Sequence, residues 1–262
     1  MVRAITPLLF FSLLSYAGDN TITIQTQGTG TTITASQAGS SNTTAIYCGL
    51  GSFDNSLVGN HTCDSATITV DVTGDSNVAY TQSVWSNHAD QTWITTVTGN
   101  SNYSVIDMDE SGSTSRITQD GNDHQAWILG SGVDNVYKIE QSGESQYGKI
   151  ISFGDDGDIW ITQEGSGDHN AYVYNSGSAH NNSTRLIQKG SGNKDADVFW
   201  YADDGDLTLT QQGNGSHTSN MKFYTDDYDV TVVQKGTTNK SYTATFNCTS
   251  NCNKTITITQ QN

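Results

Sequence analysis

The chain has 262 residues, 26 glycines, a single proline and a formal net charge of −16. This acidity argues against a nucleic-acid partner, because binding to phosphates needs clustered Lys and Arg. Hydrophobic residues make up only 34% of the chain, too few for a thick three-layer core, whereas 12 tyrosines, 5 tryptophans and many Thr, Ile and Val favour ordered β-structure over disorder.

The first 17 residues have the pattern of a signal peptide. Arg3 supplies a positive end, residues 5–14 form an apolar run, and Ser15-Tyr16-Ala17 is a small-residue cleavage signal. The run is too short to span a bilayer. We therefore predict an exported, extracellular chain that begins near Gly18 and carries no transmembrane segment.

Four cysteines, Cys48, Cys63, Cys248 and Cys252, admit three disulfide pairings. The sequence-local pairing joins Cys48 to Cys63, around an inserted loop, and Cys248 to Cys252. A zinc site is the alternative, but the spacing lacks CxxC pairs or adjacent paired histidines. Export favours disulfides, and their connectivity stays open.

A Gln-x-Gly motif recurs along the chain, at intervals of 22 to 25 residues from position 97 on. Its glutamines are Gln37, Gln119, Gln141, Gln163, Gln188, Gln211 and Gln234, and Gln260 follows in the last strand. Its glycines are Gly39, Gly121, Gly143, Gly165, Gly190, Gly213 and Gly236; Gly74 and Gly99 follow valines instead. An array of this kind predicts an all-β solenoid over residues 18–262, a single domain of about nine repeats of 22–26 residues.

We call the glutamine of each motif, or the valine that replaces it at Val72 and Val97, the anchor. The residues before each anchor alternate between the two faces of a strand. In "DIWITQEG", Ile159, Ile161 and Gln163 are expected to face one way while Trp160 and Thr162 face the other. Each repeat therefore reads as strand, glycine turn, strand and polar loop. The fifth residue after the anchor is often asparagine, and we assign a turn role to Asn42, Asn77, Asn102, Asn193 and Asn239.

A glutamine inside this core needs partners, because an unpaired buried amide costs about 1 to 3 kcal/mol. Identical amides stacked in register, ~4.8 Å apart, satisfy one another. We therefore predict a core glutamine ladder that keeps the repeats in register.

The segments "TITIQTQG" and "TITITQQN" near the two ends are alike, and neither brings a proline, helix or charge that blunts a sheet edge. The ends are thus predicted to be joining surfaces. Whether Thr21–Gln27 begins its own coil or forms the first half of the Thr31–Gln37 coil is open.

The stretches "TRLIQKGSGN", "LTLTQQGNG" and "TASQAGSSN" resemble the first half of the curlin repeat, SxxxxxQxGxxNxAxxxQ. The resemblance extends over almost all of residues 18–262. It implies a strand-turn-strand solenoid that polymerises into extracellular amyloid fibres of a biofilm matrix or cell surface, with itself as partner, a nucleating minor subunit and an export machinery, and no cofactor. The second glutamine of the repeat is absent here: Ser83 and Phe199 stand in its place.

Acidic turns at 155–158, 203–206 and 226–229 admit two interpretations. Stacked carboxylates could bind Ca²⁺, or their charge could keep single molecules soluble and resist sideways sheet addition. The second is favoured. The histidines of the turns, His124 and His169 among them, are expected to be solvated.

Aromatic residues of the second strands could pack between strands or stack on sugars, and packing is favoured. These residues are Tyr172, Tyr174, Trp200, Tyr201, Tyr224 and Tyr242.

Two rows of outward-facing threonines, one from each repeat, suggest an ice-binding face as an alternative function. One of these rows is interrupted by Arg116, Lys138, Trp160 and Arg185, whereas an ice-binding face should be regular. No carboxylate pair has the divided environment that acid–base catalysis needs, so we predict no enzyme. The alternative to a fibre subunit is a monomeric surface adhesin or an ice- or glycan-binding module.

Overall fold

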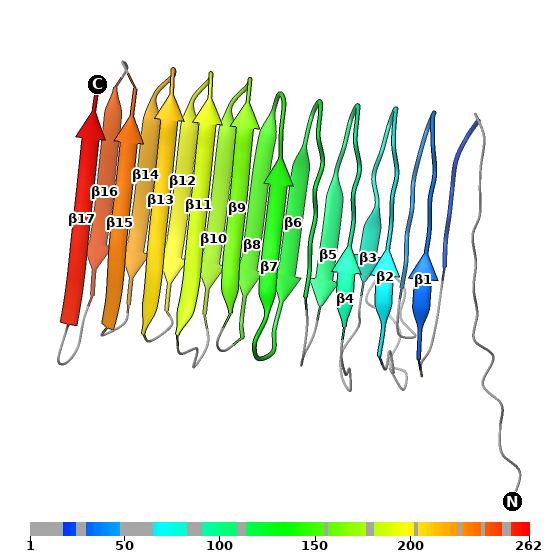
Figure 1. Cartoon of the computed structure of the whole chain (residues 1–262), viewed down its shortest axis with the longest axis horizontal. Coiled ribbons are helices and arrows are strands. Elements are labelled where there is room, and N and C mark those ends of the chain that lie inside the picture. Colours follow the sequence, from blue (N-terminus) through cyan, green and yellow to red (C-terminus); the bar gives the residue numbers. More distant parts are fainter. Residues whose placement is uncertain are drawn as a thin grey trace, which may run out of the picture.

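The computed structural model describes residues 18–24, 30–47, 65–82, 91–108, 114–154, 157–176, 181–201, 204–224, 227–236, 239–247 and 253–262. Within these ranges the chain has no helix, and its parallel strands stack into a rod-shaped β-solenoid (Figure 1). The predicted fold class is confirmed. The predicted signal peptide and the four cysteines lie outside the described residues.

The rod has two facing sheets. The first sheet contains β1 (Thr32–Thr34), β2 (Thr67–Thr69), β4 (Thr92–Ile94), β7 (Val136–Gln141), β9 (Asp158–Gly165), β11 (Asn182–Gly190), β13 (Gly205–Gly213), β15 (Asp227–Lys235) and β17 (Asn253–Gln261). The second sheet contains β3 (Tyr80–Gln82), β5 (Ser104–Met108), β6 (Gln125–Gly130), β8 (Gln146–Ser152), β10 (His169–Asn175), β12 (Lys194–Trp200), β14 (His217–Phe223) and β16 (Lys240–Phe246). We call a strand of the first sheet, its turn and the following strand of the second sheet a rung.

Successive rungs pair without a shift in register. In the first sheet, β11 pairs with β13 so that Leu186 lies beside Leu209 and Gln188 beside Gln211. Between β4 and β7, parallel bridges from Thr114 to Thr92 and to Val136 continue the sheet. Equivalent residues of the repeat therefore form straight columns along the rod.

The core is a thin layer of side chains between the sheets. In β13, Leu207, Leu209 and Gln211 are buried, whereas Thr208 is exposed, as period-two alternation requires. Each buried aliphatic side chain contributes about 1.5 to 3 kcal/mol of transfer free energy. The two strands of a single rung cannot bury these side chains by themselves, so the rungs stacked on either side complete the burial.

The segment 18–24 belongs to the second sheet. Gly18 bridges Ser40, and Ile22 bridges Thr44, both in parallel. This corrects both options considered for Thr21–Gln27, since its described part, Thr21–Ile24, lies beside the second strand of the next rung rather than in a first strand. Residues 21–24 and β17 are therefore similar in sequence but belong to different sheets.

Candidate functional site

Seven of the predicted glutamines lie in one column, which we call the glutamine file: Gln119, Gln141, Gln163, Gln188, Gln211, Gln234 and Gln260. Hydrogen bonds run along it in two parts, from Gln119 to Gln141 and from Gln163 to Gln260, and Nε2 of Gln141 has no hydrogen-bond partner among the described residues. From β11 on, each Nε2 donates to Oε1 of the preceding glutamine at 2.7 to 2.9 Å. Gln119 donates in the opposite sense, to Gln141, at 2.8 Å. All members except Gln260 are buried.

The same amides also join the two sheets. Nε2 of Gln211 donates its other hydrogen to the carbonyl of Thr218 at 2.7 Å, and Nε2 of Gln234 donates to the carbonyl of Ser241 at 3.0 Å. Gln37, further along the column, donates to the Thr43 carbonyl and accepts from the Thr43 amide at 3.2 Å. Five members of the file thus bond to a backbone carbonyl beyond the turn as well as to a neighbouring glutamine: Gln119, Gln163, Gln188, Gln211 and Gln234.

Small residues face the glutamine file from the second sheet. In register they are Ala126, Gly148, Ala171, Ala196 and Ser219. A Cβ on Gly148 would lie 3.0 Å from Cγ2 of Ile161 and 3.5 Å from Nε2 of Gln163. Small side chains therefore leave the space that the amides fill. Sequence reasoning missed this column, although its signal is the alanine two places after the asparagine in the quoted curlin pattern.

A second amide column replaces the first in the N-terminal rungs. The asparagine file consists of Asn20, Asn42, Asn77 and Asn102, whose Nδ2 groups donate to Oδ1 of the preceding member at 3.2, 2.7 and 2.7 Å. Here the two anchors without glutamine, Val72 and Val97, are buried. The polar column thus moves from the end of the first strand to the start of the second.

The turn lengthens by one residue between β7 and β9. Up to Gln146, the buried residue that opens the second strand is the fifth after the anchor; from His169 on, it is the sixth. Consequently Asn193 and Asn239, which were assigned to this position, are exposed. Asn193 instead accepts a hydrogen bond at Oδ1 from the Ser216 amide at 3.1 Å.

Histidine and lysine occupy the position that asparagine holds in the N-terminal rungs. His124, His169 and His217 are at most 1% exposed, so the expectation that the turn histidines are solvated is wrong for these three. Lys194 is equally buried, and its Nζ donates to the carbonyls of Gly190, Gly192 and Asn214 at 2.8 to 2.9 Å. The turn therefore holds a buried ammonium by three carbonyl oxygens.

Burial sets the protonation of this column. Loss of solvation lowers the pKa of His124 and of His169 to about 4, and it lowers the pKa of His217 as well. The pKa of Lys194 is also lowered, first by desolvation. The histidines are therefore neutral near pH 7 and resist protonation as long as the rod is folded.

The glycines of the repeated motif adopt two backbone conformations. Gly165, Gly190, Gly213 and Gly236 have positive φ, and a Cβ on Gly190 would lie 1.8 Å from the Gly165 carbonyl oxygen. Gly39, Gly74, Gly99, Gly121 and Gly143 lack positive φ. In those shorter turns the next residue, such as Asn122 with φ 90°, takes the positive value instead.

Aromatic side chains of the second sheet divide between core and surface. Trp200 is buried and Tyr242 packs against the core, as expected for packing residues. Tyr174, Tyr201 and Tyr224 instead face outward in adjacent rungs, and the rings of Tyr201 and Tyr224 stack at 4.4 Å and 1°. An aromatic cluster therefore lies on the outside of the second sheet, with Tyr201 and Tyr224 in register and Tyr174 in contact with Tyr201.

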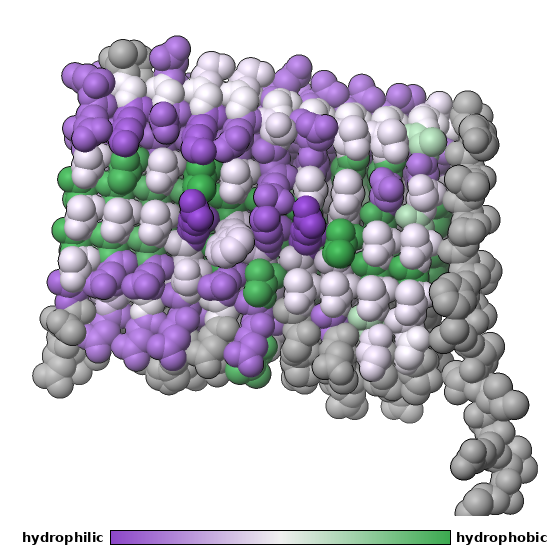
Figure 2. Space-filling view, in the orientation of Figure 1, coloured by the Kyte–Doolittle hydropathy of each residue, from purple (hydrophilic) through white to green (hydrophobic). Residues whose placement is uncertain are grey.

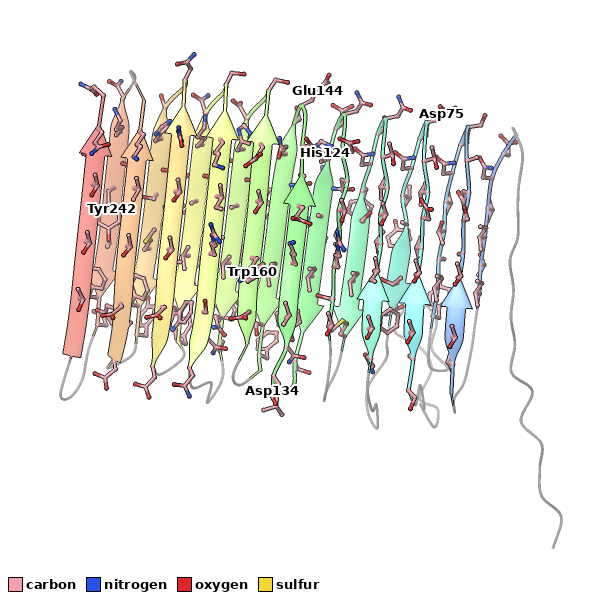
Figure 3. The ribbon with its side chains drawn as sticks, viewed as in Figure 1. Asp75, His124, Asp134, Glu144, Trp160 and Tyr242 are labelled. Carbon is pink, nitrogen blue, oxygen red and sulfur yellow. The ribbon has the colours of Figure 1, made fainter. Side chains whose placement is uncertain are left out.

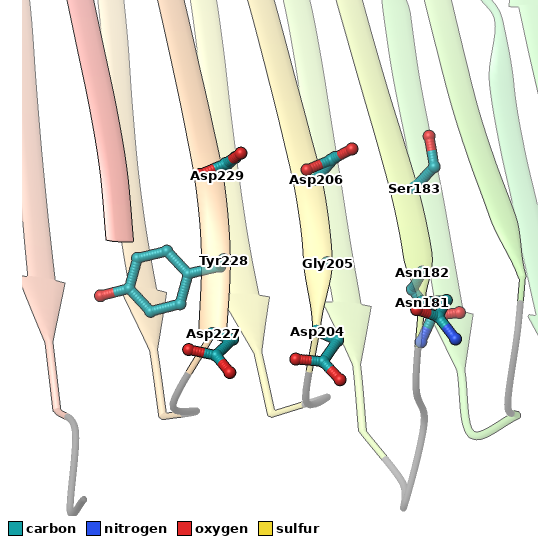
Figure 4. A pocket seen from close by; sticks show the side chains of 9 residues that line it. All are labelled: Asn181, Asn182, Ser183, Asp204, Gly205, Asp206, Asp227, Tyr228 and Asp229. Atoms are coloured by element: carbon teal, nitrogen blue, oxygen red, sulfur yellow. The ribbon is translucent and has the colours of Figure 1, made fainter. Parts of the chain in front are cut away.

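The acidic turns line a hollow at one edge of the rod (Figure 4). Asp204 and Asp227 form one row, and Asp206 and Asp229 form another. Within the described ranges, no three or more His, Cys, Asp or Glu side chains form a group that could hold a metal ion. Asp155, Asp156, Asp203 and Asp226 lie outside the described residues.

The outer face of the first sheet shows bands of similar hydropathy along the rod (Figure 2). Trp160, labelled in Figure 3, is 37% exposed, and the Nζ of Lys138 lies 5.6 Å from its ring centroid. Lys138 also pairs with Glu140 at 2.8 Å, and Arg116 pairs with Glu140 at 3.7 Å. Charged and aromatic side chains thus separate the threonines of β2 from those of β13.

The C-terminal end of the rod presents an incompletely covered inner face. Ile256 and Ile258 of β17 are 39% and 45% exposed, whereas Val230 and Val232, their partners on β15, are at most 1% exposed. Gln260 continues the glutamine file at this edge with a 2.7 Å hydrogen bond to Gln234. Backbone and side-chain groups that pair between rungs elsewhere are thus presented at the end of the rod.

Comparison with protein-family models, with curated proteins and with solved structures found no match. In the part of the chain that the structure describes, no helix is long and apolar enough to cross a membrane.

Proposed function

We propose that this chain is the subunit of an extracellular fibre, similar to curli, that polymerises head to tail by continuing its own β-ladder. The observation that carries the proposal is the C-terminal edge. There the in-register backbone ladder, the glutamine file and two apolar columns all reach the end of the rod, and no strand of the described residues lies over them. An unprotected edge of this kind is a template for another strand.

The other support comes from the sequence. Curlin-like repeats and a signal-peptide pattern accord with an exported fibre component of a biofilm matrix or cell surface. Parallel in-register strands with stacked amides are also the arrangement that makes fibrils persistent. The partner is a second copy of this chain, joined heterologously without closure, with a nucleating minor subunit and an export machinery as further proposed partners.

Electron microscopy and fibre diffraction of the purified full chain test the proposal, with mass spectrometry recording whether residues 1–17 have been removed. We expect unbranched filaments that bind amyloid dyes and diffract at about 4.8 Å along the axis. A chain that stays monomeric at high concentration for days would contradict the proposal.

Edge variants sharpen this test. Replacing Ile256 and Ile258 by Lys puts charges on the inner face of β17 and should abolish filament growth. Thr257→Lys is the matched control, because Thr257 lies between them and faces outward. Equal growth of both variants would show that this edge takes no part in assembly.

One observation favours a second function, a surface adhesin that binds glycans. Phe153, Tyr201 and Tyr224 are 55%, 37% and 40% exposed on the outside of the second sheet, and aromatic faces of this kind stack on sugar rings. Binding to a panel of immobilised glycans should be lost in Tyr201→Ala/Tyr224→Ala. Trp160→Ala, on the opposite sheet, is the control that should bind normally.

A further inference from the structure

The two sheets of the rod are offset by one strand. At the C-terminal end, β17 extends the first sheet beyond β15, and the described residues supply no strand of the second sheet at its level. At the N-terminal end, residues 18–24 extend the second sheet beyond the strand that contains Thr44, and the described residues supply no strand of the first sheet at their level. Each end thus carries half of a rung, and the halves are of opposite kind.

We infer that the joint between two protomers is a complete rung shared by both chains, with β17 of one protomer as its first strand and residues 18–24 of the next as its second. The inference rests on the proposed function and specifies its interface. It distinguishes this joint from a simple contact of two flat ends, because each chain reaches one level into its neighbour.

Columns of the first sheet continue across such a joint. In register, Ile256 lies in the column that begins with Ile33, and Ile258 lies in the column that begins with Ala35. Pairing of β17 with β1 of the next protomer would therefore stack an apolar side chain on an apolar side chain in both columns. It would cover the two isoleucines that are now 39% and 45% exposed.

Columns of the second sheet continue as well. Residues Asn20, Ile22 and Ile24 fall in the columns that end with Lys240, Tyr242 and Ala244. Tyr242 and Ala244 are only partly buried, because β16 has a partner strand on one side within the described ranges. The incoming segment would cover them with two isoleucines. Asn20 would bring an amide over the ammonium of Lys240.

The sense of the glutamine hydrogen bonds also suits this joint. From β11 to β17, every Nε2 donates toward the N-terminal end of the rod, so the Oε1 of Gln260 is the acceptor at the C-terminal end. Gln37 of the next protomer lies in the same column, and its Nε2 uses one hydrogen for the Thr43 carbonyl. The second hydrogen can reach Gln260, so the file would pass from chain to chain.

Engineered disulfides test the joint in the assembled full chain. Strands of a parallel pair lie ~4.8 Å apart, within the 4.4 to 6.8 Å between Cα atoms that a disulfide needs. One variant combines Thr34→Cys with Thr257→Cys, which reports on the first sheet. Another combines Thr23→Cys with Thr243→Cys, which reports on the second. All four threonines face outward, so the core is left intact.

Both variants should form filaments and, after mild oxidation, yield the designed linkage as a disulfide-joined peptide identified by mass spectrometry. The partners lie at opposite ends of one molecule, so each such linkage must join two protomers. Matched controls are Thr69→Cys/Thr257→Cys and Thr23→Cys/Thr245→Cys, in which the shared-rung geometry keeps the two Cα atoms more than 7 Å apart. We expect at least about tenfold less linkage in the controls.

The outcomes separate the two proposals. Filaments in which both designed linkages form support the shared rung. Filaments that form only the Thr34–Thr257 linkage, or neither linkage, overturn the shared rung while the fibre function stands. A chain that forms no filaments overturns both.

Discussion

Amide side chains decide how this polar interior is stabilised. A buried glutamine would be costly alone, but in the glutamine file a residue such as Gln211 bonds both to a neighbouring rung and to the carbonyl beyond its own turn. The bonds along the file run parallel to the rod axis, so they also fix the register of one rung on the next. The file therefore supplies specificity that the alternating Val, Ile and Leu columns lack, because apolar contacts are non-directional.

Gln211→Leu should destabilise the fold by about 2 to 4 kcal/mol, because it keeps the volume but leaves Oε1 of Gln188 without its donor and Nε2 of Gln234 without its acceptor along the file. Gln212→Leu, one residue further and exposed, is the control. Urea unfolding followed by circular dichroism measures both variants. Equal stability of the two would show that the file contributes nothing measurable.

Acid should destabilise the rod through its buried histidines. The pKa of His124 and His169 is about 4 in the folded chain, below the ordinary 6.5, so between these values the unfolded state binds protons that the folded state does not. Stability should therefore fall as the pH drops from about 6.5 toward 4, by up to roughly 2 kcal/mol per histidine at pH 5.

The double variant His124→Asn/His169→Asn should lose the part of this dependence that these two histidines cause between pH 7 and pH 5, since asparagine occupies the same column at Asn102 and does not titrate; the part due to His217 remains. Urea midpoints at several pH values are the measurement. A slope as steep as that of the unsubstituted chain would assign the acid sensitivity to other groups.

At the scale of the element, the turn divides the rod into two segments. Before β9 the turns are shorter and a residue such as Asn122 takes the positive φ; in the turns after β9, β11 and β13, a Gly-x-Gly pair such as Gly190 and Gly192 takes it at two positions. The direction of the amide hydrogen bonds also changes between the rungs of β7 and β9. Gln119 donates to Gln141, toward the C-terminal end of the rod, whereas Gln188 donates to Gln163, toward the N-terminal end. A change in turn length thus coincides with a change in the polar column.

Gly190→Ala should cost at least about 2 kcal/mol, because the alanine would combine a positive φ with a Cβ 1.8 Å from the Gly165 carbonyl oxygen. Gly121→Ala is the matched control. It is the glycine of the same motif, but it lacks positive φ and has nothing within 4 Å of its Cβ position, so its effect should stay within about 0.5 kcal/mol. Thermal unfolding distinguishes them, and equal midpoints would contradict the assignment of two turn types.

The strand pattern could be predicted because it is local. Alternation in "LTLTQQG" places Leu207, Leu209 and Gln211 on one face whatever lies beyond them. The extra turn residue could not be predicted by counting five places from each anchor, since Asn193 fills that place while Lys194 enters the core. Lysine at a buried position contradicts its ordinary preference, and only the three carbonyls of the stacked turns make it stable there.

The place of residues 18–24 depends on a distant contact rather than on composition. "TITI" near the N-terminus and "TITIT" in β17 have the same alternation, yet the first pairs in the second sheet and the second in the first. Periodicity says which face of a strand is buried. It does not say which of two similar sheets the strand joins.

At the scale of the whole molecule, the charge of −16 opposes the attraction between rods. Part of this charge lies in rows along the axis, as Asp204 with Asp227 and Asp206 with Asp229 in Figure 4. Carboxylates of adjacent rungs, ~4.8 Å apart, lie within one Debye length at physiological ionic strength. Such rows favour single rods over lateral sheets until salt screens them.

Filament growth should therefore accelerate as NaCl is raised from about 10 to 300 mM. The variant Asp204→Asn/Asp206→Asn/Asp227→Asn should grow faster at low salt and depend less on it. Thr208→Asn/Thr218→Asn, which changes exposed residues without changing charge, should behave as the unsubstituted chain. Growth followed by dye fluorescence measures this, and identical salt dependence in all three would place the repulsion elsewhere.

The two turn types have a consequence for how such a molecule changes over evolutionary time. Inside either segment, neighbouring rungs present each other with turns of the same length, so a tandem duplication of one whole repeat lengthens the molecule without creating a mismatch in turn length. A repeat copied across the boundary at β9 would meet a turn of the wrong length. Rods of this type can thus vary in size by growth within each segment, while the boundary itself is kept single.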